Sequence, residues 1–186
     1  MLYTPSSSLS KSEPVVEGRI VIGFSWDACV PTLSLAGIRG LDLDTTCLTY
    51  DADGKLIDTV WFRDKTSRCG AIKHRGDDPS FANDRFADEI VVDLNMLSGD
   101  LTRLVFVVNS LGPQRFDAVK SCSFSIRDLP TEQLVASEIQ DAFGLHKAFM
   151  VFALIRADFG WEISSIGQSC IGRTMDQTAE IAFKAA

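Results

Sequence analysis

Residues 19–26 read RIVIGFSW, and this stretch decides the fold class because apolar side chains recur at every second position. Successive side chains in a strand point to opposite faces, so Ile20, Ile22, Phe24 and Trp26 would share one face. Other short apolar or alternating stretches, separated by turn residues, lie at 41–50, 60–62, 89–94, 101–108, 122–126, 148–155 and 161–166. About eight short strands without βαβ alternation predict an all-β, two-sheet β-sandwich.

Four segments fall outside this pattern. Residues 134–143 have apolar positions at helical spacing, although a short apolar run does not distinguish a helix from a strand. Residues 175–183 suit a short C-terminal helix. Residues 63–88 hold many Gly, Asp, Asn, Arg and Ser residues without a period, which predicts a long loop. The first 17 residues are rich in Ser, so we expect a flexible N-terminal segment (1–17) before one domain (18–186).

Composition excludes several classes of function. The net charge of −7 argues against binding to nucleic acid, which requires Lys and Arg to neutralise phosphates. No apolar stretch approaches the roughly 20 residues of a membrane-spanning helix, and the N-terminus lacks a signal-peptide core. The five cysteines are scattered, without a C-x-x-C pair. The common hydrolase, nucleotide and metalloprotease signatures are absent from the sequence. We therefore expect a cytoplasmic protein that is not an enzyme.

Acidic residues gather in one loop. Residues 76–89 read GDDPSFANDRFADE and hold five carboxylates and one Asn amide. Calcium takes six to eight oxygen ligands from such groups, so this loop indicates a calcium site. A solvated surface loop whose charges never converge is the alternative. Asp42 and Asp44 form a second acidic pair, and at strand period both side chains face one side. They either close the cation site from across the sandwich or simply face solvent.

His74 also bears on metal chemistry. It lies five residues after Cys69, but no third soft ligand is nearby in the sequence. We therefore expect His74 to be a structural residue at the edge of a strand.

Several motifs together resemble the TerD family of tellurium-resistance and stress proteins, from about Arg19 to Phe183. The segments that carry the resemblance are GFSWD at 23–27, LDLD at 41–44, DADGK at 51–55, CGAIKHRGDD at 69–78, DEIVVDL at 88–94, LVFVV at 104–108 and WEISSIGQ at 161–168. The resemblance implies a β-sandwich, a strand at Leu134 to Ile139, and calcium bound by acidic residues. Carried over position by position, the implied ligands are Asp27, Asp42, Asp44, Asp77, Asp78, Asp84, Asp88 and Glu89.

The resemblance also implies a function, although the sequence departs from the family pattern in the acidic loop. Members act in resistance to tellurite and other stresses, which predicts a non-catalytic calcium-binding stress protein, with other stress-response proteins as a further class of partner. In the acidic loop, however, Phe81, Ala82, Arg85 and Phe86 replace the family's Gly and acidic residues. A protein-interaction scaffold with a degenerate metal site is therefore the alternative.

Overall fold

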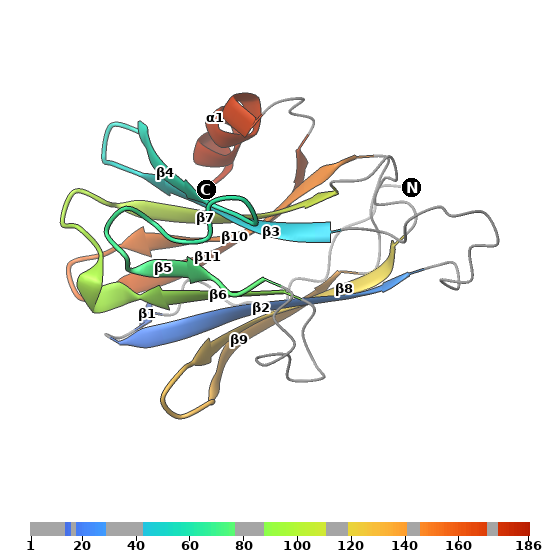
Figure 1. Ribbon diagram of the computed structural model, residues 1–186, viewed down its shortest axis with the longest axis horizontal. Coiled ribbons are helices and arrows are strands. Elements are labelled where there is room, and N and C mark those ends of the chain that lie inside the picture. Colours follow the sequence, from blue (N-terminus) through green and yellow to red (C-terminus); the bar gives the residue numbers. More distant parts are fainter. Residues whose placement is uncertain are drawn as a thin grey trace.

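The protein is a sandwich of two antiparallel sheets (Figure 1). The computed structural model describes residues 14–15, 18–28, 43–76, 88–110, 119–140, 146–170 and 175–186. The six-stranded sheet has the order β1-β11-β10-β7-β3-β4, and the five-stranded sheet has the order β5-β6-β2-β8-β9. The elements are β1 (Pro14–Val15), β2 (Arg19–Ala28), β3 (Leu43–Tyr50), β4 (Leu56–Val60), β5 (Ile72–His74), β6 (Asp88–Asp93), the 3-10 turn η1 (Leu94–Met96), β7 (Arg103–Ser110), β8 (Val119–Asp128), β9 (Leu134–Gln140), β10 (Ala148–Arg156), β11 (Trp161–Cys170) and α1 (Met175–Ala185). The predicted two-sheet β-sandwich with a short C-terminal helix is confirmed.

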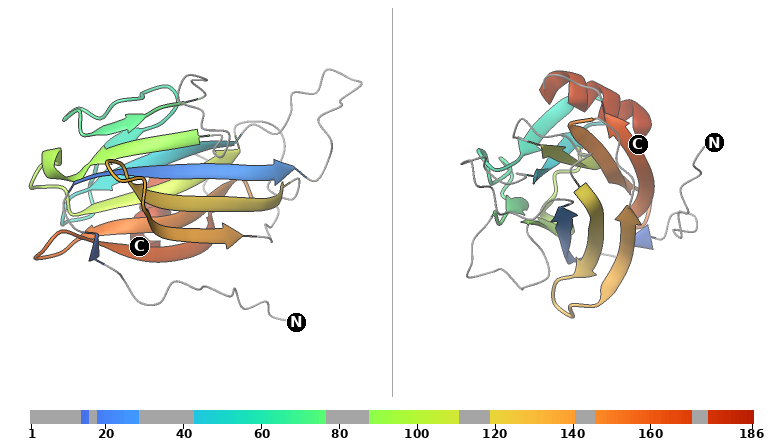
Figure 2. Two further views of the ribbon diagram at one scale, coloured as in Figure 1. Left: turned by 90° about the horizontal axis from the view of Figure 1, so that it is seen from below. Right: turned by 90° about the vertical axis from the view of Figure 1, so that its right-hand side faces the viewer.

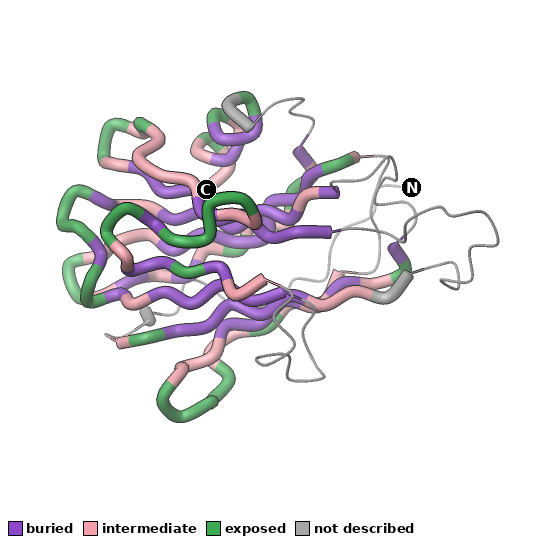
Figure 3. Tube along the Cα trace, viewed as in Figure 1, coloured by how far each residue is buried: buried purple, intermediate pink, exposed green. Residues whose placement is uncertain are grey.

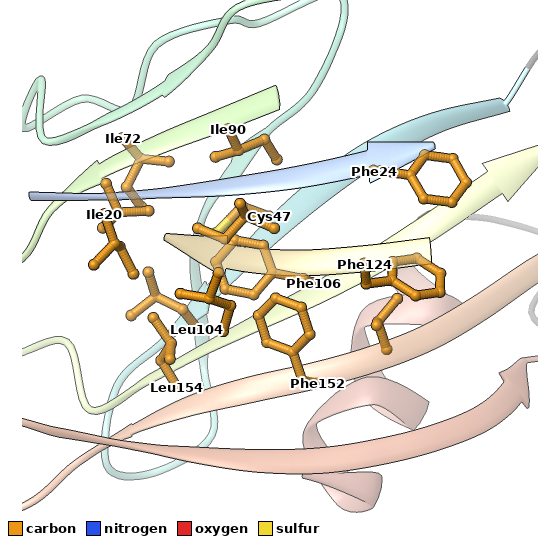
Figure 4. Close-up of a cluster of buried hydrophobic side chains, with 14 of the residues drawn as sticks. Ile20, Phe24, Cys47, Ile72, Ile90, Leu104, Phe106, Phe124, Phe152 and Leu154 are labelled. Atoms are coloured by element: carbon orange, nitrogen blue, oxygen red, sulfur yellow. The ribbon is translucent and has the colours of Figure 1, made fainter. Parts of the chain in front are cut away.

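The main core fills the space between the two sheets, as the period-two pattern predicts (Figure 4). Phe24 of β2 stacks on Phe124 of β8 with ring centroids 5.0 Å apart. On the facing sheet, Phe106 of β7 packs against Phe152 of the neighbouring strand β10 with ring centroids 4.9 Å apart. The strands β3, β6, β7 and β10 are buried along most of their length, whereas the edge strands β4 and β9 and most connecting turns are more exposed (Figure 3). This burial holds the two sheets face to face, and it brings β3 of one sheet close to β6 of the other.

The helix α1 covers the outer face of the six-stranded sheet (Figure 2). Its small residues Ala179 and Ala182 are buried against that face. The hydroxyl of Tyr50 donates to the carbonyl oxygen of Ala179 at 2.7 Å. Near the end of the helix, the ring of Phe183 reaches the β3–β4 turn at Gly54. The helix therefore ties the C-terminal segment to the β3–β4 hairpin.

The structure resolves the ambiguity at 134–143 in favour of a strand. β9 pairs with β8 at the edge of the five-stranded sheet, so the strand expected at Leu134 to Ile139 is confirmed. Residues 141–145 lie outside the described residues. Leu134 and Ile139 are exposed on this edge strand. Packing against β8, rather than apolar spacing along the chain, selects the strand.

Two further segments differ from expectation. Residues 63–88 were predicted to be a long loop, but this region contains β5, which pairs with β6. β5 has only three residues, too few for a period to emerge from the sequence. Within the segment expected to be flexible at 1–17, β1 pairs with β11, and residues 1–13 and 16–17 lie outside the described residues. In the described part of the chain, no helix is long and apolar enough to cross a membrane.

The contact between Gly54 and α1 generates a stability prediction. Gly54 has φ +80°, and a Cβ there would lie 2.5 Å from the ring of Phe183. Gly54→Ala is therefore expected to destabilise the protein by about 1–3 kcal/mol in urea unfolding. Gly70 also has a positive φ but open space around it, so Gly70→Ala should cost less. Gly99→Ala, where neither constraint applies, should be near neutral. Equal effects at all three positions would contradict the proposed contact.

Candidate metal centre

The candidate site begins where the six-stranded sheet loses its outermost strand. β4 pairs with β3 only as far as Cys47, which lies opposite Val60, whereas β7 pairs along the whole length of β3. Among the described strands, none therefore pairs with the first residues of β3 on that side. At this point β6 of the other sheet approaches β3 (Figure 1). The backbone groups on the open side of β3 must find other partners, because buried peptide groups are almost always hydrogen-bonded.

Side chains of the five-stranded sheet supply those partners to Thr45. The N–H of Thr45 donates to Oδ2 of Asp88 at 2.7 Å, and the Thr45 hydroxyl donates to the same oxygen. Nε2 of His74 lies 3.1 Å from the carbonyl oxygen of Thr45. Asp88 begins β6 and His74 ends β5, so the two strands deliver both groups to one end of the sandwich. The backbone of Thr45 is satisfied by an acid and an imidazole from the opposite sheet.

The imidazole of His74 is buried and has a defined environment at both nitrogens. Nε2 lies 3.4 Å from Oδ1 of Asp44 and 3.3 Å from Oδ2 of Asp88, in addition to its contact with Thr45. Nδ1 accepts a hydrogen bond from the backbone N–H of Gly76 at 3.0 Å. A carbonyl oxygen can only accept and a backbone N–H can only donate. In the neutral imidazole, the hydrogen-bond network therefore assigns the proton to Nε2 and a lone pair to Nδ1. A second proton, on Nδ1, would break the contact with the N–H of Gly76.

The two carboxylates each have one oxygen held and one oxygen spare. Asp44 and Asp88 are only 8% and 3% exposed. Among the described residues, Oδ2 of Asp44 and Oδ1 of Asp88 are buried without a hydrogen-bond partner. A buried, unpaired carboxylate oxygen is costly, and a divalent cation is one group that would satisfy it. The donor set fits calcium, which binds carboxylate oxygens.

Electrostatics favour an extra proton in this cluster when no cation is bound. Burial alone lowers the pKa of His74, but hydrogen bonds to Asp44 and Asp88, together with their negative charges, raise it to about 9. Burial raises the pKa of Asp44, and the charge of Asp88 raises it further, while the hydrogen bond from His74 lowers it. The two shifts share one contribution, because the negative charge of a neighbouring acid raises both pKa values.

Glu89 lies in a separate ion-pair network. Successive strand residues face opposite sides, so Glu89 points away from the side of Asp88. Its Oε2 is 3.1 Å from Arg75 and its Oε1 is 2.8 Å from Arg127. Arg127 also pairs with the exposed Glu132 at 2.7 Å. The structure therefore does not bring Glu89 into the cluster of Asp44, His74 and Asp88.

The remaining predicted ligands are not placed by the structure. The backbone of Asp27 lies in β2, paired with Ser121 of β8, but its side chain is not described. Four further predicted ligands, Asp42, Asp77, Asp78 and Asp84, lie outside the described residues. The described residues thus bring together two of the eight predicted ligands.

Sequence reasoning missed the part played by His74. It was expected to be a structural residue at a strand edge, yet its side chain lies buried between two acids. The available signal was the alternation of Ile72 and His74, which places both on the inner face of one strand. Cys69, considered beside His74 as a soft ligand, is exposed, and its Sγ is 3.4 Å from the Ser67 hydroxyl.

The chain is similar in sequence to tellurium-resistance and stress proteins. The TerD domain profile matches residues 4–180. Tellurium resistance protein TerZ of Serratia marcescens is 32% identical over 173 residues, covering 91% of this chain and 89% of that protein. General stress protein 16U of Bacillus subtilis (strain 168) is 24% identical, with 88% and 86% covered. Stress response protein SCP2 of the same organism is 23% identical, with 81% and 82% covered.

Solved structures share the fold. A homologue of telluride resistance protein (TerD) from Streptomyces coelicolor A3(2) superposes with a TM-score of 0.67 at 20% identity, covering 88% of this chain and 95% of that one. A second crystal structure, of a protein of unknown function, gives a TM-score of 0.70 at 19% identity, with 90% and 98% covered. The same sandwich therefore recurs in distant sequences.

The shifted pKa values predict how the stability of the metal-free protein depends on pH. The folded-state pKa of His74 lies above its ordinary value of 6.5, so its stabilisation is complete below pH 6.5 and is lost as the pH rises through about 9. The raised pKa of Asp44 acts in the same direction. In EDTA, the free energy of unfolding should fall by at most about 3 kcal/mol over this range. His74→Gln should flatten the profile, whereas His146→Gln should not. A wild-type profile that rises with pH would contradict the assignment.

The ion pairs of Glu89 predict that substituting this residue lowers the free energy of unfolding without changing the response to calcium. Glu89→Gln removes a buried charge that pairs with two partly buried arginines, so a loss of about 2–4 kcal/mol is expected in urea unfolding. The matched control, Glu132→Gln, breaks an exposed pair of the same Arg127 and should cost about 1 kcal/mol or less. Neither change should alter the thermal shift produced by calcium. If Glu89→Gln alone abolished the thermal shift produced by calcium, Glu89 would have to be counted as a calcium ligand.

Proposed function

Because the chain belongs to the TerD family, we propose that it is a calcium-binding stress-response protein that works in the cytoplasm and is not an enzyme. The family membership supports the role in stress, since relatives along most of the chain are named for tellurium resistance or general stress. The buried acidic cluster supports the calcium part of the proposal. The acidic composition, with a net charge of −7, is compatible with a cationic ligand.

One observation carries the proposal: two buried carboxylates each keep an oxygen without a partner among the described residues. Asp44 and Asp88 would supply these oxygens to the ion. Calcium needs six to eight oxygens, so further ligands are required. The loop that joins His74 to Asp88 carries Asp77, Asp78 and Asp84, and Asp42 precedes β3. These residues would complete the site.

Calcium at this place would hold the two sheets together. Asp44 lies on β3 of the six-stranded sheet and Asp88 on β6 of the five-stranded sheet. An ion bound by both would oppose separation of the sheets and neutralise two like charges. A ligand that binds only the folded state stabilises it by RT ln(1 + [L]/Kd), about 2.7 kcal/mol at a hundredfold excess over Kd. Calcium concentration would thus set the stability of the protein.

The protein-interaction scaffold is the second candidate, and one observation favours it. The edge strand β9 exposes Leu134 and Ile139, which are 61% and 70% accessible. Exposed apolar residues on an unpaired strand edge are a common place for another chain to bind. Calcium titration separates the two candidates, because a scaffold with a decayed metal site would give neither heat nor stabilisation.

Titration of EDTA-stripped protein tests the proposal directly. Wild-type protein should release or absorb heat with calcium and should show a rise in Tm of about 5 °C or more at millimolar calcium. Asp44→Asn and Asp88→Asn should each weaken binding at least about tenfold, since each removes a charged ligand oxygen. The control Asp100→Asn changes an exposed acid in a turn away from the site and should bind as wild type does. No heat and no shift in the wild-type protein would refute calcium binding.

A further inference from the structure

We infer that His74 is a positioning residue that holds the two carboxylates for an oxygen-coordinated cation, and that it is not itself a metal ligand. The inference rests on the proposed calcium site and adds a reason why that site would prefer calcium to zinc. The three groups lie close enough together to resemble a His–Asp–Asp site for zinc, since one ligand atom of each falls within 4.8 Å of the others. The hydrogen bonds around the imidazole decide between the two possibilities.

The first argument concerns Nε2. This nitrogen faces three oxygens: the carbonyl of Thr45 at 3.1 Å and one oxygen each of Asp44 and Asp88 at 3.3–3.4 Å. A nitrogen with a lone pair directed at a carbonyl oxygen would be repelled, whereas an N–H is attracted to all three oxygens. Metal ligation needs that lone pair. Nε2 is therefore a donor in this arrangement.

The second argument concerns Nδ1. Its lone pair accepts the backbone N–H of Gly76 at 3.0 Å, so it too is engaged. Gly76 has φ +64°, a conformation that favours glycine. The turn that fixes the ring is thus specific to glycine, and it also begins the acidic loop. A zinc ion would have to break one of these two contacts.

As a consequence, the two oxygens of each acid have different roles. His74 faces Oδ1 of Asp44 and Oδ2 of Asp88, the second of which Thr45 also holds. The opposite oxygens, Oδ2 of Asp44 and Oδ1 of Asp88, stay free of hydrogen bonds within the described residues. Outer groups that orient ligands in this way raise metal affinity without touching the ion. Because only oxygens are offered, the site favours calcium over ions that seek imidazole nitrogen.

Two substitutions separate positioning from ligation. His74→Gln keeps an N–H donor near the place of Nε2, and His74→Leu removes it at similar size. Calcium affinity should stay within about fivefold of wild type in His74→Gln and should fall more than about tenfold in His74→Leu, the loss expected for a hydrogen bond to a charged group. Thermal unfolding in EDTA establishes that each variant is folded, and His146→Gln serves as the control. Equal loss of affinity in both His74 variants would overturn the inference.

Nitrogen-15 NMR of histidine-labelled protein gives an independent test that does not depend on the variants. Nε2 of His74 should carry a directly bonded proton both in EDTA and with calcium, and zinc should leave its resonance unshifted. An Nε2 without a proton, or one shifted by zinc, would overturn the inference. The failure of the proposed function is a separate result: the wild-type protein would not bind calcium, while the proton on Nε2 would still decide whether His74 is a donor.

Discussion

The backbone of Thr45 is the constraint on which the candidate site depends. β4 stops opposite Cys47, so the peptide groups of Thr45 on that edge of β3 have no partner strand within the described part of the chain. An open edge inside a sandwich must be closed, and here the closure comes from the other sheet: Asp88 accepts the Thr45 N–H and His74 contacts the Thr45 carbonyl. The early end of one short edge strand thus requires an acid and an imidazole at the same place. The polar cluster is part of how the fold satisfies its own backbone.

The cluster that closes this edge holds more negative charge than the backbone of Thr45 requires. Thr45 requires one acceptor and one donor, which a single oxygen of Asp88 and the Nε2–H of His74 provide. Asp44 adds a second buried acid, and two oxygens then have no partner among the described residues. Replacing buried charged groups by apolar groups of similar volume often leaves a protein as stable or makes it more stable. Stability of the metal-free fold therefore does not account for Asp44, whereas the proposed cation would.

Much of the fold was predictable because it depends on local periodicity. The alternation in β2 and β8, and the apolar runs in β7 and β10, gave strands whose inner faces now form the core. Segments set by tertiary packing were harder: β5 is too short for a pattern, and the apolar spacing of β9 suited a helix until its pairing with β8 was known. The set of metal ligands stays a prediction, and the structure shows only which of its members lie together. Asp44 and Asp88 were among the expected ligands, but the contact of His74 with both acids joins residues far apart in the chain, which no spacing rule reveals.

Parity along a strand explains why Asp88 lies in the cluster with Asp44 and His74 whereas Glu89 does not. Neighbouring residues on β6 face opposite sides, so only one of the two acids can point toward β3. Asp88 does so and meets Thr45, whereas Glu89 meets Arg75 and Arg127 on the other side. Each acid is thus matched to its side of the sheet: the outward one is neutralised by arginines, and the inward one shares a buried space with a second acid and a single imidazole. On the inward side the donors of Thr45 and His74 leave one oxygen of each acid without a partner among the described residues, and that imbalance is the physical reason to expect a cation there and not beside Glu89.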